Sequence, residues 1–305
     1  MKALFCSPIP TVDMRLGASR AVMDLAEAWR DNGWDCDVYS AEGKNVSFAE
    51  YPAHLAEYLK EHATDYDVVD FPYHCVPWIE KRHSRTLTVA RVVLLAEHCY
   101  FEKDPQPSIS LKSRIVSLSR ARSRARNEEA SMLSLQHQKA NILQSNLTSV
   151  GNSRDKQCLL RLGFSESKII TVPFGISDAH KKRLFQCSAL PGNTQAPSIV
   201  FIGTFDYRKG CLDWRDVITL VSESFPQVRL KLIGTRGMCQ RADEVYRFFP
   251  KNAHDRISVI PTFEPTMLPA LLDGCSIGVF PSYREGFGIG VVEMLAAGLP
   301  VVAYD

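Results

Sequence analysis

The chain has 305 residues, of which 45% are hydrophobic and 23% are charged. This composition is typical of a globular protein and excludes a disordered or fibrous chain, and the length suits two α/β domains of about 150 residues each. The 36 Lys and Arg residues against 34 Asp and Glu residues leave a formal net charge of +2. This balance argues against a nucleic-acid partner.

The nine cysteines are scattered, and no two of them form a Cys-x-x-Cys pair. This spacing favours a reduced, cytosolic protein over a disulfide framework. Near the N-terminus, two prolines and Asp13 interrupt the apolar run, which favours a first strand over a signal peptide. No uninterrupted apolar run reaches the roughly 18 residues of a membrane-spanning helix. We therefore expect a cytoplasmic protein.

Short apolar runs alternate with helical stretches through the first part of the chain. This alternation predicts a parallel, doubly wound sheet. The expected strands are Ala3–Ser7, Asp35–Ser40, Asp67–Phe71, Thr86–Leu95, Leu147–Gly151 and Lys168–Pro173. The expected helices are Ser19–Asn32, Tyr51–His62, Arg154–Leu162 and a long polar helix over Ser110–Gln144.

Gln186–Pro197 has no apolar periodicity and is typical of a linker. We place the domain boundary there, with domains at residues 1–188 and 189–305. A second series of strands and helices follows, so the predicted fold class is α/β, with two Rossmann-like doubly wound domains facing across a cleft. Its strands are Ser198–Ile202, Val228–Ile233, Arg256–Ile260, Ile277–Phe280 and Pro300–Tyr304, and its clearest helices are Thr266–Cys275 and Gly290–Ala297.

The loops that follow the second-domain strands are the candidate ligand site, because open α/β sheets bind ligands beyond the carboxyl ends of their strands. Three of these loops combine glycine with Arg or Lys: Gly203–Gly210, Gly234–Gly237 and Pro281–Gly288. A diphosphate needs both close backbone approach and positive charge. The sequence therefore predicts a diphosphate site at this rim.

The last of these loops is the most specific. Gly286 and Gly288 allow backbone amides to point at an anion just before a helix that begins near Gly290. Glu293, one turn into that helix, could accept hydrogen bonds from two ribose hydroxyls, and Glu285 could do the same for a hexose. The alternative is an ordinary helix-end charge and a solvated face residue. Two glutamates that flank a Gly-x-Gly turn after a buried strand favour the functional interpretation.

The segment Glu285–Val302 resembles the Glu-x7-Glu signature of glycosyltransferase family 4. Val172–Gly175 resembles the Val-x-Pro-Asn-Gly segment of that family, and Lys209-Gly210 and Leu232–Gly234 fall in its order. The resemblance covers nearly the whole chain, weakly in the first half and strongly from Ile169 onward. It implies the GT-B fold, retention of the anomeric configuration and no bound metal or cofactor.

The resemblance also implies a nucleoside-diphosphate sugar as the donor substrate of the second domain. Glu293 would bind the donor ribose, Lys209 the diphosphate, and Glu285 with the amides around Phe287 and Gly288 the sugar and phosphate. The implied donor-binding residues are Gly203, Thr204, Arg208, Lys209, Glu285, Gly286, Phe287, Gly288 and Glu293. The candidate catalytic residues are His98, Lys209 and Glu285.

The first loop departs from the family pattern, which often has arginine directly after the glycine where this chain has Thr204. Two interpretations of Arg208 remain open. It could supply the missing charge, or it could be a surface arginine beside a weaker diphosphate site. The proposed electrostatic mechanism uses Lys209, Arg208 and the helix N-terminus at Gly288 to stabilise the departing nucleoside diphosphate.

The first domain would be the acceptor side. Gly17 matches a family glycine near the donor phosphate and the acceptor, and His98 matches a histidine at the reaction centre, although a lone His after a strand is often structural. His74 lies in a similar place. The repeated pairs His74-Cys75 and His98-Cys99 raise a zinc site, but they lack the spacing of a metal motif.

A basic stretch precedes the second half of the long polar helix. It is either a solvated helix paired with Glu128 and Glu129, or a contact with anionic lipid at the inner face of the membrane. The latter would suit a lipid-linked acceptor. The stretch comprises Lys112, Arg114, Arg120, Arg122, Arg124 and Arg126.

The predicted function is that of a retaining hexosyltransferase acting on a glycan or lipid-linked acceptor, in cell-surface polysaccharide or glycolipid synthesis. Two alternatives remain. One is a catalytically weak or inactive nucleotide-sugar-binding module, and the other is a nucleotide-sugar epimerase or phosphorylase of similar architecture. Family members usually continue beyond the strand that ends near Asp305, so we expect a second domain that is incomplete at its C-terminus.

Overall fold

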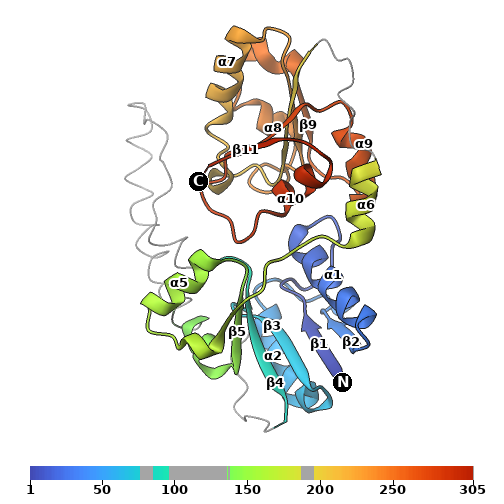
Figure 1. Cartoon of the computed structure of the whole chain (residues 1–305), viewed down its shortest axis with the longest axis vertical. Helices are drawn as coiled ribbons and strands as arrows, with labels where there is room; N and C mark the ends of the chain where they lie inside the picture. The colour runs from blue at the N-terminus through green and yellow to red at the C-terminus, as the bar shows by residue number, and fades with distance from the viewer. Residues whose placement is uncertain (76–84, 96–135, 137, 187–195, 305) are drawn as a thin grey trace. The chain divides into compact units, whose positions relative to one another are not determined.

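The computed structural model describes residues 1–75, 85–95, 136, 138–186 and 196–304. It divides into two compact units, Met1–Phe174 and Gly175–Asp305 (Figure 1). The expected boundary after residue 188 lies outside the described residues, as do His98 and the whole basic stretch of residues 112–126. Of the long polar helix, residues 136 and 138–144 are described and helical.

The first unit contains a six-stranded parallel sheet in the order β2-β1-β3-β4-β5-β6. Its strands are β1 (Lys2–Cys6), β2 (Asp35–Tyr39), β3 (Val68–Pro72), β4 (Leu87–Val92), β5 (Leu147–Val150) and β6 (Ile169–Thr171). Its named helices are α1 (Gly17–Asp31), α2 (Tyr51–His62), α5 (Ser153–Arg161) and the single turns η1 (Ala63–Asp65) and η2 (Glu166–Lys168). The strand order reverses between β1 and β3, as in a doubly wound fold. The predicted α/β class is confirmed here.

The second unit contains a five-stranded parallel sheet in the order β11-β10-β7-β8-β9. Its strands are β7 (Ser198–Ile202), β8 (Arg229–Ile233), β9 (Ile257–Ile260), β10 (Ile277–Phe280) and β11 (Val301–Ala303). Its helices are α6 (Asp178–Gln186), α7 (Trp214–Ser224), α8 (Ala242–Tyr246), α9 (Leu268–Leu272), α10 (Ile289–Ala296) and the short η3 (Tyr207–Lys209), η4 (Lys251–Arg256) and η5 (Pro265–Met267). The strand order is that of a Rossmann sheet, and it reverses between β7 and β10.

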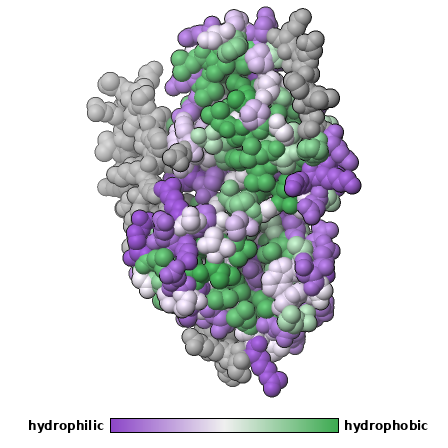
Figure 2. Space-filling view, viewed as in Figure 1, coloured by the Kyte–Doolittle hydropathy of each residue, from purple (hydrophilic) through white to green (hydrophobic). Residues whose placement is uncertain are grey.

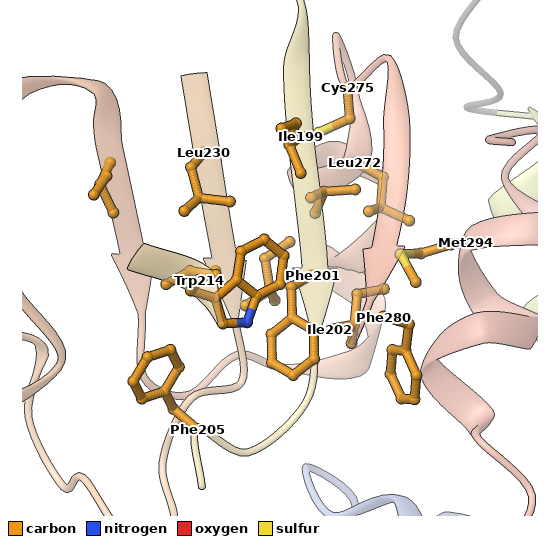
Figure 3. Close-up of a cluster of buried hydrophobic side chains, with 14 of the residues drawn as sticks. Ile199, Phe201, Ile202, Phe205, Trp214, Leu230, Leu272, Cys275, Phe280 and Met294 are labelled. Carbon is orange, nitrogen blue, oxygen red and sulfur yellow. The ribbon is translucent and has the colours of Figure 1, made fainter. Parts of the chain in front are cut away.

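Aromatic side chains fill the core beneath this reversal point. Phe201 of β7 lies with its ring centroid 5.5 Å from Trp214 and 5.6 Å from Phe280 of β10. Figure 3 shows Met294 of α10 beside Phe280, so the helix, β10 and β7 share one core. Because protein interiors are close-packed, the position of α10 over β7 and β10 is fixed by these contacts.

Two helices of the second unit differ from expectation. The helix predicted over Thr266–Cys275 is shorter, because α9 ends at Leu272 and Gly274 follows with a φ of +69°. Helix α6 was not predicted. Its sequence is rich in charged residues, and its buried residues are His180 and Leu184, one turn apart.

Within the described residues, no helix has both the length and the apolar character to cross a membrane. In the view of Figure 2, hydrophobic residues run along the middle of the second unit and hydrophilic residues gather at its margins. Large exposed hydrophobic side chains occur on several elements, for example Leu220 on α7, Met267 in η5 and Leu295 on α10. Scattered residues of this kind are ordinary on a protein surface.

Candidate functional site

The site is built from the two loops at the reversal point of the second sheet. One loop follows β7 and the other follows β10, and the two strands are paired neighbours. The backbone amide of Tyr283 donates to the carbonyl of Arg208 at 2.9 Å. Gly210 has a φ of +72°, and a β-carbon there would overlap the carbonyl oxygen of Pro281. The two loops are therefore packed into one structure at the place where open sheets bind ligands.

The centre of these loops is the carboxylate of Glu285. Its Oε1 atom accepts hydrogen bonds from Lys209 Nζ and, at 2.6 Å, from the hydroxyl of Ser282. The Nη1 atom of Arg208 lies 3.5 Å from the same oxygen and donates to the carbonyl of Arg284 at 2.9 Å. The structure thus brings together three residues predicted from the sequence, although 76 positions separate Lys209 from Glu285.

Lys209 is a largely buried cation, with 12% of its side chain exposed. Burial lowers the pKa of its ammonium group, the charge of Glu285 raises it, and nearby Arg208 lowers it. The ammonium also lies 4.9 Å from the centre of the Phe280 ring, within reach of a cation–π interaction. Glu285, with a smaller contribution from Asp206, therefore favours the charged form of Lys209.

Thr204 stabilises the loop after β7. Its hydroxyl donates to Asp206 Oδ2 at 2.6 Å, and the backbone amide of Lys209 donates to Asp206 Oδ1 at 3.0 Å. Asp206 is the N-cap of η3, so this network holds the turn that presents Arg208 and Lys209. Arg208 is half-buried and lies 3.5 Å from Glu285, and its role as the source of positive charge for a diphosphate stays a prediction.

The loop after β10 leads directly into α10. Gly288 is the N-cap residue with a φ of +79°, and Gly286 and half-buried Phe287 precede it in the same loop. A β-carbon on Gly290 would lie 2.5 Å from the carbonyl oxygen of Ile202. Only glycine allows the first turn of α10 to lie so close to the end of β7. On the other loop, Gly203 directly follows β7 and has a φ of +155°.

Glu293 is completely buried on α10, with 0% of its surface exposed. This burial excludes the alternative in which it is a solvated face residue. Its Oε1 atom lies 3.1 Å from Nε2 of His180, which is itself only 5% exposed and belongs to α6. His180 was missed in the sequence. His180 lies one turn from Leu184, and an apolar residue at position 180 would complete the buried face of the helix. This spacing was the signal that the sequence contained.

The candidates of the first unit are placed as follows. Gly17 is the first residue of α1, and His74 follows β3 with an exposed side chain, while Cys75 is buried with its thiol 3.6 Å from the carbonyl of Pro8. Among the residues that the structure describes, no three His, Cys, Asp or Glu side chains are grouped to hold a metal ion. His98 and Cys99 are not among those residues.

A buried ion pair in the first sheet was also missed. Nη1 of Arg91, on β4, lies 2.9 Å from Oδ1 of Asp70, on β3, and Nη2 of Arg91 donates to the carbonyl of Cys6 at 2.6 Å. Burial raises the pKa of Asp70, and the charge of Arg91 lowers it. Arg91 thus ties three neighbouring strands together near their carboxyl ends.

Comparison with known proteins bears on the second unit most directly. Residues 196–305 match the family model described as "Glycosyl transferases group 1". An uncharacterized 41.2 kDa protein in the cps region of Klebsiella pneumoniae is 27% identical over 150 residues, 48% of this chain and 39% of that protein. A phosphatidylinositol N-acetylglucosaminyltransferase subunit of Arabidopsis thaliana is 25% identical over 154 residues, 50% of this chain and 33% of that protein. The matches thus span well under half the length of these relatives.

Solved structures match nearly the whole chain. Sucrose-phosphate synthase from Thermosynechococcus elongatus has a TM-score of 0.72 and 18% identity, covering 99% of this chain and 80% of the other. Anabaena HepE in complex with UDP-glucose has a TM-score of 0.63 and 17% identity over the same shares. These similarities establish that the chain has the GT-B fold. The family match supports a glycosyltransferase.

Proposed function

We propose that this protein is a retaining glycosyltransferase that moves a hexose from a nucleoside-diphosphate sugar to a glycan or lipid-linked acceptor. The observation that carries the proposal is the cluster of Lys209, Arg208 and Glu285 at the reversal point of the second sheet, on the same unit as buried Glu293. All four residues lie in the segment that matches the glycosyltransferase family model.

The diphosphate of the donor would bind Lys209 and Arg208. These two cations are the groups of the cluster that can pair with an anion. The positive end of α10, which begins after Gly288, would add to that attraction. Glu293 would accept hydrogen bonds from the donor ribose, and Glu285 would contact the sugar. The UDP-glucose complex of HepE supports a UDP-sugar as the first donor to test.

The chemistry that these groups support is electrostatic. Negative charge accumulates on the nucleoside diphosphate as its bond to the anomeric carbon breaks, and Lys209 and Arg208 would stabilise that charge. For retention, the acceptor oxygen would bond to the anomeric carbon on the face that the diphosphate leaves, and the departing phosphate oxygen would take the acceptor proton. His98 and Gly17 are the proposed residues of the acceptor side.

The acceptor is proposed to be a glycan or a lipid-linked molecule of a cell-surface polysaccharide or glycolipid pathway. The name of the Arabidopsis relative, which includes phosphatidylinositol, supports the lipid class. The basic stretch of residues 112–126 would then contact anionic lipid at the inner face of the membrane. Binding of the purified protein to anionic vesicles at low salt tests this step, and indifference to such vesicles would remove it.

The donor site is tested with a thermal-shift panel of UDP-, GDP- and ADP-sugars. A ligand that binds only the folded protein at 100 times its dissociation constant stabilises it by about 2.7 kcal/mol, so the true donor must raise the midpoint. We expect Lys209→Ala and Glu293→Ala each to lower the rate of donor turnover about ten-fold or more. NMR of the glycoside formed on the acceptor gives its anomeric configuration, which must match that of the donor if the reaction retains configuration.

Each other outcome has a distinct meaning. A thermal shift without turnover would indicate the binding-module alternative. A requirement for inorganic phosphate, or an epimerised sugar, would indicate the phosphorylase or epimerase alternative. Wild-type turnover in both variants would refute the assignment of Lys209 and Glu293 to the donor site.

A further inference from the structure

The contact between α6 and α10 is built around one polar pair. His180 Nε2 lies 3.1 Å from Glu293 Oε1, and both residues are buried, at 5% and 0% exposure. The other buried residue of α6 is Leu184, one turn further along and on the same face. The opposite face carries exposed charged residues that include Lys182. His180 therefore occupies a core position of an amphipathic helix.

A polar residue at such a position requires a reason, because an aliphatic side chain would pack there without any need for a partner. Burial of a carboxylate is unfavourable unless hydrogen-bond donors replace water. His180 supplies one donor to Glu293 from an element outside α10. A carboxylate has about four lone-pair directions, so the single hydrogen bond from His180 can orient the group without occupying all of them.

We propose that His180 is a positioning residue for the nucleotide ribose, acting by fixing the carboxylate of Glu293. This inference rests on the proposed function, in which Glu293 binds the ribose hydroxyls. A carboxylate held in one rotamer loses no side-chain freedom when the ribose binds, and its oxygens already have the required direction. Loss of His180 would remove one of the contacts that orient this carboxylate before the ligand binds.

The test must measure the contact with the ribose rather than the overall stability of the protein. Binding of UDP, GDP and ADP is compared with binding of their 2′-deoxy forms by isothermal titration calorimetry. A merely structural role for His180 would weaken both forms equally. A positioning role would selectively reduce the preference for the ribose form. We expect a preference of about ten-fold in the wild-type protein, the value of one hydrogen bond to a charged group.

A pair of neutral amides gives the sharpest contrast. In His180→Gln, the side-chain amide nitrogen can take the place of Nε2. In His180→Asn, the side chain is too short for its amide nitrogen to reach Glu293. We expect His180→Gln to retain most of the ribose preference, and His180→Asn and His180→Leu to reduce it to about two-fold. Lys182→Ala, on the exposed face of the same helix, is the matched control and should leave the preference unchanged.

The outcomes separate the inference from the function on which it rests. Failure of the wild-type protein to bind any nucleoside diphosphate refutes the proposed function and this inference together. Binding with an undiminished ribose preference in His180→Asn overturns the role of His180 alone. If the leucine variant does not fold, the comparison of His180→Gln with His180→Asn still decides, because equal preferences in those two contradict the proposal.

Discussion

Replacement of Glu285 by glutamine is predicted to separate the binding of nucleoside diphosphate from turnover. Glu285 pairs with Lys209 and lies 3.5 Å from Arg208, so a diphosphate bound to these cations must share them with a carboxylate. The substitution removes one negative charge from the cluster and leaves both cations. We expect tighter binding of the bare nucleoside diphosphate and slower sugar transfer, because Glu285 is the proposed contact of the sugar.

The expected gain in binding can be bounded. Two unit charges about 4 Å apart interact by about 4 kcal/mol at an effective dielectric constant of about 20. The side chains of Glu285 and Arg208 are 23% and 29% exposed, so solvent screening reduces this value. A net gain of about 1–2 kcal/mol remains, which corresponds to roughly 5- to 30-fold tighter binding. Turnover of the donor should nevertheless fall about ten-fold or more.

The pH dependence of the Glu285→Gln variant is a second signature. Burial lowers the pKa of Lys209 and Glu285 raises it, so removal of the carboxylate lets that pKa fall further. An anion binds the protonated lysine, so affinity is full below the pKa of Lys209 and declines above it. The decline should therefore begin at a lower pH in the variant than in the wild-type protein. The gain in affinity should be largest near pH 6 and smaller near pH 9.

Calorimetric titration of UDP, GDP and ADP at these two pH values measures both effects. Glu223→Gln is the matched control, since Glu223 is an exposed residue of α7 and its substitution changes the net charge equally. Affinity in Glu285→Gln that is no greater than wild type at pH 6 would show that Glu285 and the diphosphate do not compete for Lys209.

Two further predictions concern contacts inside each unit, one in the second unit and one in the first. Gly290→Ala should lower stability by about 1–3 kcal/mol and weaken nucleotide binding, because its β-carbon meets the carbonyl of Ile202, whereas Gly175→Ala enters open space and should leave the thermal midpoint unchanged. Arg91→Met should destabilise the protein by about 3–5 kcal/mol at pH 8 by leaving buried Asp70 unpaired. Without Arg91, the folded-state pKa of the Asp70 carboxyl rises above its unfolded value near 4. The free-energy penalty for ionising this buried carboxyl is therefore absent below pH 4 and grows as pH rises. Urea unfolding should accordingly show a smaller loss of stability at pH 5 than at pH 8. Equal losses at the two pH values would contradict this account, as would an unchanged midpoint in Gly290→Ala.

The strands and the donor-loop candidates could be predicted because each depends on a local pattern. Ser198–Ile202 and Ile277–Phe280 are short apolar runs bounded by turn residues, and the structure forms strands over those residues. Lys209 and Glu285 were recognised as members of strand-end loops. Their pairing depends on the order β10-β7 in the sheet, and no local pattern contains that order.

His180 and the pair of Asp70 with Arg91 escaped prediction for the same physical reason. A histidine within a charged stretch is typical of a solvated helix. Only its contact with buried Glu293, 113 positions away, identifies His180 as a partner of that carboxylate. Likewise, a single charge inside an apolar strand suggests a partner without naming it. The sequence pattern thus indicates which groups are candidates to bind an anion or a sugar. The contacts that fix those groups come from elements distant in the chain, so these contacts decide how far each carboxylate is oriented before a ligand arrives.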